Sequence, residues 1–219
     1  MICYPTIPIH VLEAIVRACP AAIEVRDHLG DTPLHIAITK HSHNVEGEIK
    51  VHGSKIFGAL VDANPGVCYV KNKEGMTPLH MYCRYAYMDV GLLKKFIAAN
   101  RDALTTKTKM GTLSPMSTSP PRSVSETFMH PVVDAEHRSV VGMSELRYRD
   151  KGNAACIRDG GYPLHLALAN PSVTYQSAKL LIDEAPEVLS LRDKHHRSPL
   201  QVALQFNAPM SITGLLFGN

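Results

Sequence analysis

Histidine is the residue type in this sequence that most invites a chemical role, with 12 copies in 219 residues. Imidazole nitrogens bind zinc and transfer protons near neutral pH, so closely spaced histidines are the first candidates for a metal site. Two close pairs are present, His41-x-His43 and His195-His196, but no third or fourth ligand stands at a suitable spacing from either pair. We therefore predict no metal ion and no cofactor, and we interpret both pairs as surface residues in loops or turns; a weak metal site at one of the pairs is the alternative.

A nucleophilic cysteine is the next possibility. Cys83 follows His80 by three residues, which on a helix brings a thiol close to a base. The alternative, which we favour, is that Cys83 fills an apolar face between helices. The sequence has no Gly-x-Ser-x-Gly elbow and no glycine-rich phosphate loop. We predict no catalytic residues and no enzymatic activity.

Charge and cysteine usage narrow the class of protein further. The 23 Lys and Arg against 20 Asp and Glu give a net charge of only +3, and no concentrated basic stripe stands out, so we expect no nucleic-acid partner. Five scattered cysteines without a Cys-x-x-Cys pair favour a reducing compartment. No secretory leader or membrane-spanning apolar run is recognisable. We expect an intracellular protein, cytoplasmic or nuclear.

The elements that position these residues are indicated by a block that occurs four times. Each block has a Pro-Leu pair after Thr, Tyr or Ser, and three of the four continue with His: Thr32-Pro33-Leu34-His35, Thr77-Pro78-Leu79-His80, Tyr162-Pro163-Leu164-His165 and Ser198-Pro199-Leu200-Gln201. A hydroxyl before proline can cap a helix, and proline suits the first helical position. Leu34, Ala37 and Ile38 then recur at helical spacing. Each block therefore predicts the start of a short, packed helix.

A second amphipathic run accompanies each block and predicts a second helix. The runs cover residues 56–61, 92–97 and 178–182, with further copies at 11–19 and 212–217. Several runs stop at a proline, and we expect an extended stretch after four of them, over residues 22–27, 67–72, 103–108 and 188–193. One unit therefore reads as turn, helix, loop, helix.

Thr-Pro-Leu-His followed by a second helix resembles the ankyrin repeat. The resemblance covers nearly the whole chain except residues 112–150. It implies an all-α fold: an ankyrin-like helix-turn-helix repeat solenoid with short hairpin turns and about five units, the third degenerate and starting at Leu113. In such repeats the histidine is a structural residue, so His35, His80 and His165 are expected to tie each preceding turn to its helix.

The expected domain organisation has three parts. Residues 1–111 and 151–219 hold the N-terminal and C-terminal ankyrin-like repeats, and residues 112–150 hold a Ser/Pro-rich insertion and the degenerate repeat, whose outer helix could be 139–148. Ser114 and Ser119 precede prolines, and Ser125 follows Arg122 at basophilic-kinase spacing. These three serines are candidate phosphorylation sites, and chance matches in a Ser/Pro-rich linker are the alternative.

The resemblance implies a non-enzymatic protein-protein interaction module, a scaffold or adaptor; the alternative is a structural or regulatory fragment of a larger multidomain protein. Ankyrin domains typically bind partners at the hairpin tips and the adjoining inner-helix face. The matching positions here are Arg26, Asp27, His28, Lys71, Asn72, Lys73, Lys107, Thr108, Lys109, Arg158, Asp159, Arg192, Asp193 and Lys194. Basic residues prevail among them, so we expect a partner with an acidic face; ordinary solvated turns are the alternative. The sequence leaves the partner and the oligomeric state open.

Overall fold

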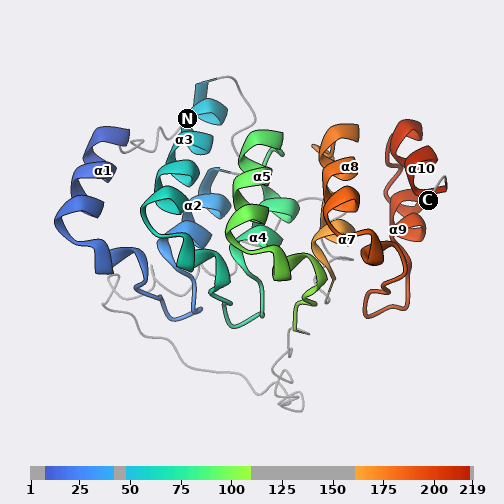
Figure 1. Cartoon of the computed structure of the whole chain (residues 1–219), viewed down its shortest axis with the longest axis horizontal. Helices are drawn as coiled ribbons and strands as arrows, with labels where there is room; N and C mark the ends of the chain where they lie inside the picture. Colours follow the sequence, from blue (N-terminus) through green and yellow to red (C-terminus); the bar gives the residue numbers. More distant parts are fainter. Residues whose placement is uncertain (1–7, 42–47, 110–160, 218–219) are drawn as a thin grey trace, which may run out of the picture. The chain divides into compact units, whose positions relative to one another are not determined.

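The computed structural model describes residues 8–41, 48–109 and 161–217, and the described chain is all-α (Figure 1). It contains nine α-helices and four short 3-10 helices, with no strand among the described residues. Residues 1–110 and 159–219 form one compact unit, and residues 111–158 form a second. Everything that follows concerns the first unit.

Four short helices form one layer: α2 (Pro33–His41), α4 (Pro78–Tyr85), α7 (Pro163–Leu168) and α9 (Pro199–Gln205). Each begins at the proline of a Pro-Leu block, so the four predicted helix starts are confirmed. Proline has the right φ for the first turn and no N–H to leave unpaired there. At α9 the Ser198 hydroxyl also accepts the N–H of Gln201 at 3.3 Å, which caps the helix.

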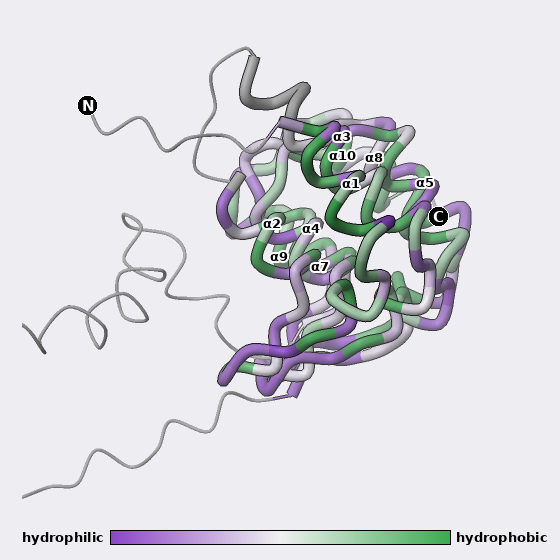
Figure 2. The backbone as a smooth tube through the Cα atoms, turned by 90° about the vertical axis from the view of Figure 1, so that its left-hand side faces the viewer, coloured by the Kyte–Doolittle hydropathy of each residue, from purple (hydrophilic) through white to green (hydrophobic). Residues whose placement is uncertain are grey.

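The second layer consists of α1 (Ile9–Ala18), α3 (Glu48–Ala63), α5 (Val90–Ala99), α8 (Tyr175–Glu184) and α10 (Met210–Phe217). Within each layer consecutive helices are in contact, and each short helix also contacts the longer helix that follows it. Figure 2 shows the two layers nearly end-on, with hydrophilic turns projecting beside the layer of short helices. The core lies between the layers, where Leu34, Leu79 and Leu164 are almost completely buried.

A 3-10 turn follows four of the outer helices: η1 (Pro20–Ile23), η2 (Pro65–Tyr69), η3 (Arg101–Thr105) and η5 (Pro186–Leu189). The prediction of extended chain over residues 22–27, 67–72, 103–108 and 188–193 is therefore wrong for the first two or three residues of each stretch, which belong to the 3-10 turns. Asn64 and Asn100 show why, because each leaves the helix with φ near −150° and its side chain accepts an N–H of the next turn. At Asn100 the turn forms without a proline.

The third 3-10 turn contacts the start of α7, although the two are far apart in the sequence. Thr108 donates its N–H to the Gly161 carbonyl at 3.2 Å, and Gly161 donates its N–H to the Thr108 hydroxyl at 2.9 Å. These are the places that Asn72 and Met76 take in the preceding turn. Among the described helices, α4 also contacts α7 directly. The predicted degenerate third unit, with residues 113 and 139–148, lies outside the described residues and stays a prediction.

Candidate functional site

One side chain closes each hairpin turn, and Asn72 shows how. Its Oδ1 accepts the N–H groups of Glu74 at 3.1 Å and Met76 at 2.9 Å, while its own N–H donates to the Met76 carbonyl. Asp27 and Asp193 make the same bonds with the residues two and four positions further on. A short polar side chain is suited to this role because it can replace a backbone acceptor in a tight turn.

The turns also share a residue with positive φ three positions after the closing residue. Gly30 has φ 76° and Gly75 has φ 74°, a region that glycine adopts at little cost. In the last turn His196 takes this conformation with φ 58°. Glycine at position 75 is also required for steric reasons. A Cβ there would lie 2.7 Å from the backbone nitrogen of Lys109 in the next turn.

The motif histidines link each turn to the one after it. The Thr77 hydroxyl lies 2.8 Å from His80 Nδ1, and His80 Nε2 lies 2.8 Å from the Thr106 carbonyl. Since a carbonyl only accepts, Nε2 carries the proton and Nδ1 accepts from Thr77. His35 makes the equivalent bonds to Thr32 and to the Met76 carbonyl.

These histidines are held in the neutral form. Burial lowers the pKa of His80 to about 4, against the favourable effect of its bond to the Thr106 carbonyl. Burial also lowers the pKa of His35 and of His165. In His35 and His80, Nδ1 lies 3.3 Å from the backbone nitrogen of Thr32 or Thr77. A proton on Nδ1 would therefore point at another N–H donor, which opposes protonation. Their role is structural bonding rather than proton transfer.

The third and fourth copies depart from this scheme in informative ways. Tyr162 replaces threonine and offers no hydroxyl beside the ring, so His165 Nδ1 is buried without a hydrogen-bond partner. His165 Nε2 still donates to the Arg197 carbonyl at 3.1 Å. In the last copy Gln201 takes the place of histidine and accepts the N–H of Ser198 at 2.8 Å through Oε1.

The pair of His80 and Cys83 does not form a nucleophile and its base. Cys83 is completely buried, and burial raises the pKa of its thiol, which keeps it protonated. Both ring nitrogens of His80 are engaged by Thr77 and Thr106. Among the described residues there is also no group of three or more His, Cys, Asp and Glu side chains placed to hold a metal ion.

The predicted contact residues separate into two groups by burial. Asn72, Thr108 and Asp193 are buried, and their side chains close the turns or, for Asp193, also form a 2.6 Å ion pair with Arg197. The side chains of these three residues point inward to close the turns, so they are less suited to partner contact than the exposed tip residues. Asp27 is half-buried in the same role. Arg158 and Asp159 lie outside the described residues.

The residues on either side of each closing residue face solvent. The closing side chain points into the turn to bond its amides, and the residues before and after it do not take part in these bonds. All eight neighbours are basic: Arg26 and His28, Lys71 and Lys73, Lys107 and Lys109, Arg192 and Lys194. We call these eight residues the basic ridge. Lys194 is half-buried and the other seven are exposed.

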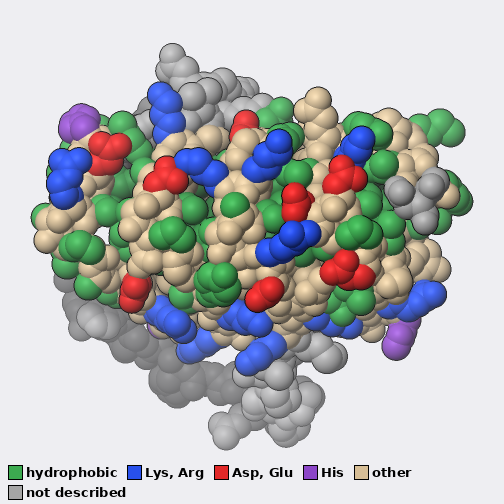
Figure 3. Space-filling view, viewed as in Figure 1, with side chains coloured by type: hydrophobic (Ala, Val, Ile, Leu, Met, Phe, Trp, Pro, Cys, Tyr) green, Lys and Arg blue, Asp and Glu red, His purple; other side chains and the backbone are tan. Residues whose placement is uncertain are grey.

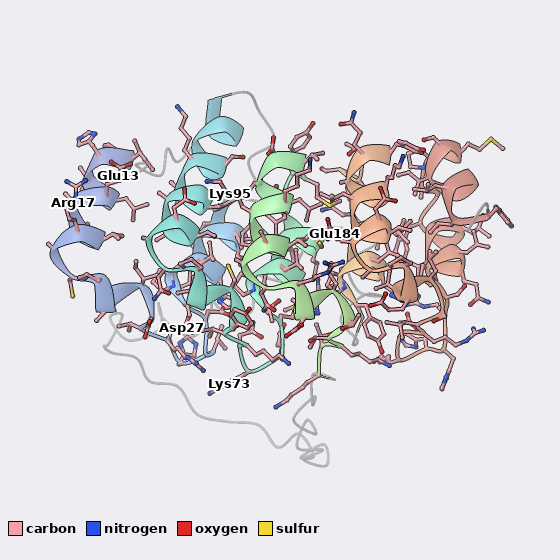
Figure 4. All side chains as sticks on the ribbon, in the orientation of Figure 1. Glu13, Arg17, Asp27, Lys73, Lys95 and Glu184 are labelled. Atoms are coloured by element: carbon pink, nitrogen blue, oxygen red, sulfur yellow. The ribbon has the colours of Figure 1, made fainter. Side chains whose placement is uncertain are left out.

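Contacts between neighbouring turns give the order of the basic ridge. Lys73 donates its N–H to the Leu29 carbonyl at 2.9 Å, which joins the first two turns, and Gly75 packs against Lys109 of the third. Lys107 Nζ donates to the Arg192 carbonyl at 3.3 Å, which joins the last two. Figure 3 shows Lys and Arg gathered along the lower edge of the face shown, and Figure 4 shows Asp27 and Lys73 at this edge, apart from Arg17 and Lys95 of the longer helices.

The expectation that the chain carries no basic stripe is therefore wrong. Its members are spread from residue 26 to residue 194 and come together only when the turns stack. Aligning the four segments on Asp27, Asn72, Thr108 and Asp193 would have revealed them. Like charges about 10 Å apart in water repel each other by about 0.4 kcal/mol before salt screening. The folded chain can tolerate this repulsion, and a bound anionic group would relieve it.

The comparisons with known proteins give no family for this chain. No family model matches it, and no curated protein shows significant sequence similarity to it. Within the part of the chain that the structure describes, no helix has both the length and the apolar character needed to cross a bilayer.

Proposed function

We propose that this chain is an ankyrin-type helical repeat module that binds another protein through its hairpin turns. Support for the repeat architecture comes from the two layers of helices and from the hydrogen bonds shared by successive turns. Support for binding comes from the different roles of the residues within each turn. The closing residue holds the backbone with its own side chain, while exposed ridge residues such as Lys71, Lys73 and Lys109 present their charges at the surface of the turns.

The observation that carries the proposal is that all eight residues of the basic ridge are of the basic type. Lys and Arg make up 23 of 219 residues, about one in ten, yet they fill every ridge position except that of His28. Solvated turns need polar residues but no particular charge. A protein partner with an acidic face accounts for the bias, because complementary charge speeds association and disfavours wrong partners.

The test uses two triple variants of the full chain with the same change in charge. Lys71→Glu, Lys73→Glu and Lys109→Glu alter the basic ridge, whereas Lys55→Glu, Lys94→Glu and Lys179→Glu alter exposed positions on the longer helices. Each protein is used to capture partners from a native extract. We expect the ridge variant to lose a partner that the wild type and the control variant retain. Equal capture by all three would contradict the proposal.

The alternative, a structural or regulatory fragment of a larger multidomain protein, is supported by a different observation. Leu204 in α9 is 56% exposed and Phe217 in α10 is 70% exposed. At the equivalent places in the preceding helix pair, Leu168 is 1% exposed and Ile182 is 4% exposed. An exposed apolar surface of this kind is typical of a contact with another protein surface.

A further inference from the structure

The four pairs of basic residues form a ladder with regular rungs. In each rung the closing residue separates two basic residues. Adjacent rungs are joined by the backbone bond from Lys73 to Leu29, by the close approach of Gly75 to Lys109, and by the bond from the Lys107 side chain to the Arg192 carbonyl. The turns follow helices that pack against their neighbours within each layer, and packed helices lie 8–10 Å apart. Four rungs therefore extend over about 25–30 Å.

Three aspartates of the turns are engaged within the turns themselves. Asp31 is buried and accepts a hydrogen bond from Asn72 Nδ2 at 2.9 Å. Asp193 is buried and paired with Arg197. Asp27 directs Oδ1 at two backbone amides. The basic side chains lie nearer to solvent, because seven of the eight ridge residues are exposed, although Lys107 and Arg192 also donate to carbonyls of the last turn.

We infer that the ladder binds an extended acidic segment of the partner protein, with one carboxylate for each hairpin turn. This inference rests on the proposed function and specifies the partner's chemistry. A polyproline II chain advances about 3.1 Å per residue with three residues per turn, so every third side chain lies on one face at about 9 Å spacing. That spacing agrees with the rungs. Successive residues of a strand are about 3.3 Å apart and alternate faces, so alternate side chains repeat at about 6.6 Å.

Nucleic acid fits the ladder less well than an acidic protein segment. The phosphates of one strand follow each other more closely than the rungs, at a rise of about 3.4 Å per nucleotide. Binding of single strands also relies on aromatic side chains between the basic ones, on which bases stack. The ridge residues themselves include no aromatic side chain other than the imidazole of His28. The ladder supplies point charges at wide, regular intervals.

The experiment compares two acidic peptides of the same composition, both with blocked ends. In one, the unit Glu-Pro-Pro occurs four times, so that its carboxylates follow the rungs; in the other, the four Glu precede the eight Pro. Binding to the full chain is measured by fluorescence anisotropy at 50 mM and 150 mM salt. We expect the regularly spaced peptide to bind about ten times more tightly, because clustered carboxylates reach fewer rungs.

Variants of single rungs test the same inference from the side of the protein. Lys71→Gln with Lys73→Gln removes the second rung, and should weaken the regularly spaced peptide about threefold to tenfold and reduce its salt dependence. Lys94→Gln with Lys179→Gln removes two exposed charges of the longer helices and should leave the affinity unchanged. Circular dichroism establishes that each variant is folded.

Several results would overturn the inference. These are equal affinity for the two peptides, no binding of the regularly spaced peptide at 1 mM, or tighter binding of a 12-nucleotide single strand than of either peptide. If one of them occurs while the ridge variant still loses its captured partner, the extended acidic segment is wrong and the proposed function stands. If the ridge variant keeps that partner, the proposed function fails as well.

Discussion

His165 differs from His35 and His80 because its Nδ1 has no hydrogen-bond partner. All three rings donate from Nε2 to a carbonyl of the following turn, but only the first two have a threonine hydroxyl beside Nδ1. A buried polar atom without a partner costs about 1–3 kcal/mol. The third copy is therefore the weakest of the histidine links, and a single substitution can repair it.

We predict that Tyr162→Thr stabilises the chain by about 1 kcal/mol, because the new hydroxyl can donate to His165 Nδ1. The change also removes the ring that lies 5.9 Å from Lys107 Nζ, an exposed contact of smaller effect. Tyr162→Val is the matched control, since valine has the shape of threonine without the hydroxyl. Urea denaturation gives the comparison, and a threonine variant no more stable than the valine variant would contradict the account.

The same histidines make stability depend on pH. An unfolded histidine has a pKa near 6.5, whereas burial lowers that of His80 to about 4, so the unfolded chain binds more protons between these values. The free energy of unfolding should be largest above pH 6.5 and fall as the pH decreases towards 4. Each such histidine contributes at most about 1.4 kcal/mol per pH unit in this window.

His80→Gln isolates the contribution of one histidine. Gln201 shows that glutamine can accept the N–H at the same place in a Pro-Leu block. We predict that the variant folds. Its free energy of unfolding should fall less steeply between pH 6.5 and pH 4, because its unfolding takes up about one proton fewer than that of the wild type. Denaturation curves collected across this range measure the slope. An unchanged slope would mean that His80 is protonated in the folded chain.

At the scale of elements, helices were easier to predict than the turns between them. Proline at positions 33, 78, 163 and 199 has a strong and local preference for the first helical turn, and all four helices begin there. The 3-10 turns were missed because four or five residues show no periodicity. Asn72 and Asp193 looked like solvated turn residues, since sequence alone does not say which polar side chain points inward.

The close packing of successive turns gives a prediction at this scale. Gly75→Ala should destabilise the chain by about 1–3 kcal/mol, because Gly75 has positive φ and its added Cβ would meet the Lys109 nitrogen at 2.7 Å. Gly214→Ala in α10 is the control: nothing lies within 4 Å of its Cβ, and alanine favours a helix. Thermal denaturation compares the two, and equal stability would show that the second and third turns are not packed in this way.

At the scale of the whole unit, function depends on residues that are far apart in the sequence. The basic ridge combines residues 26 and 194, and no local motif connects them. The third turn is completed by Thr108 and Gly161, 53 positions apart. The hydrogen bonds that join these two residues could not be predicted, because no local pattern pairs residues so far apart in the sequence. The candidate surface could be predicted as separate residues and not as one ridge.

The exposed apolar side chains of α9 and α10 give a prediction at this same scale. Neither helix contains a charged residue, so nothing in them opposes contact with another apolar surface. If the alternative function holds, the chain should associate as its concentration rises, and Leu204→Gln with Phe217→Gln should abolish this association. Sedimentation velocity over a hundredfold range of concentration decides the point. A wild-type chain that stays monomeric throughout would exclude self-association through this surface.

The central claim, recognition through the basic ridge, is tested most directly by the salt dependence of the interaction with a captured partner. Affinity is measured at several ionic strengths for the wild type, for the ridge variant and for the control variant of the longer helices. We predict that the ridge variant binds at least about ten times more weakly and with a shallower dependence on salt, while the control variant matches the wild type. Unchanged affinity and slope in a folded ridge variant would contradict the account.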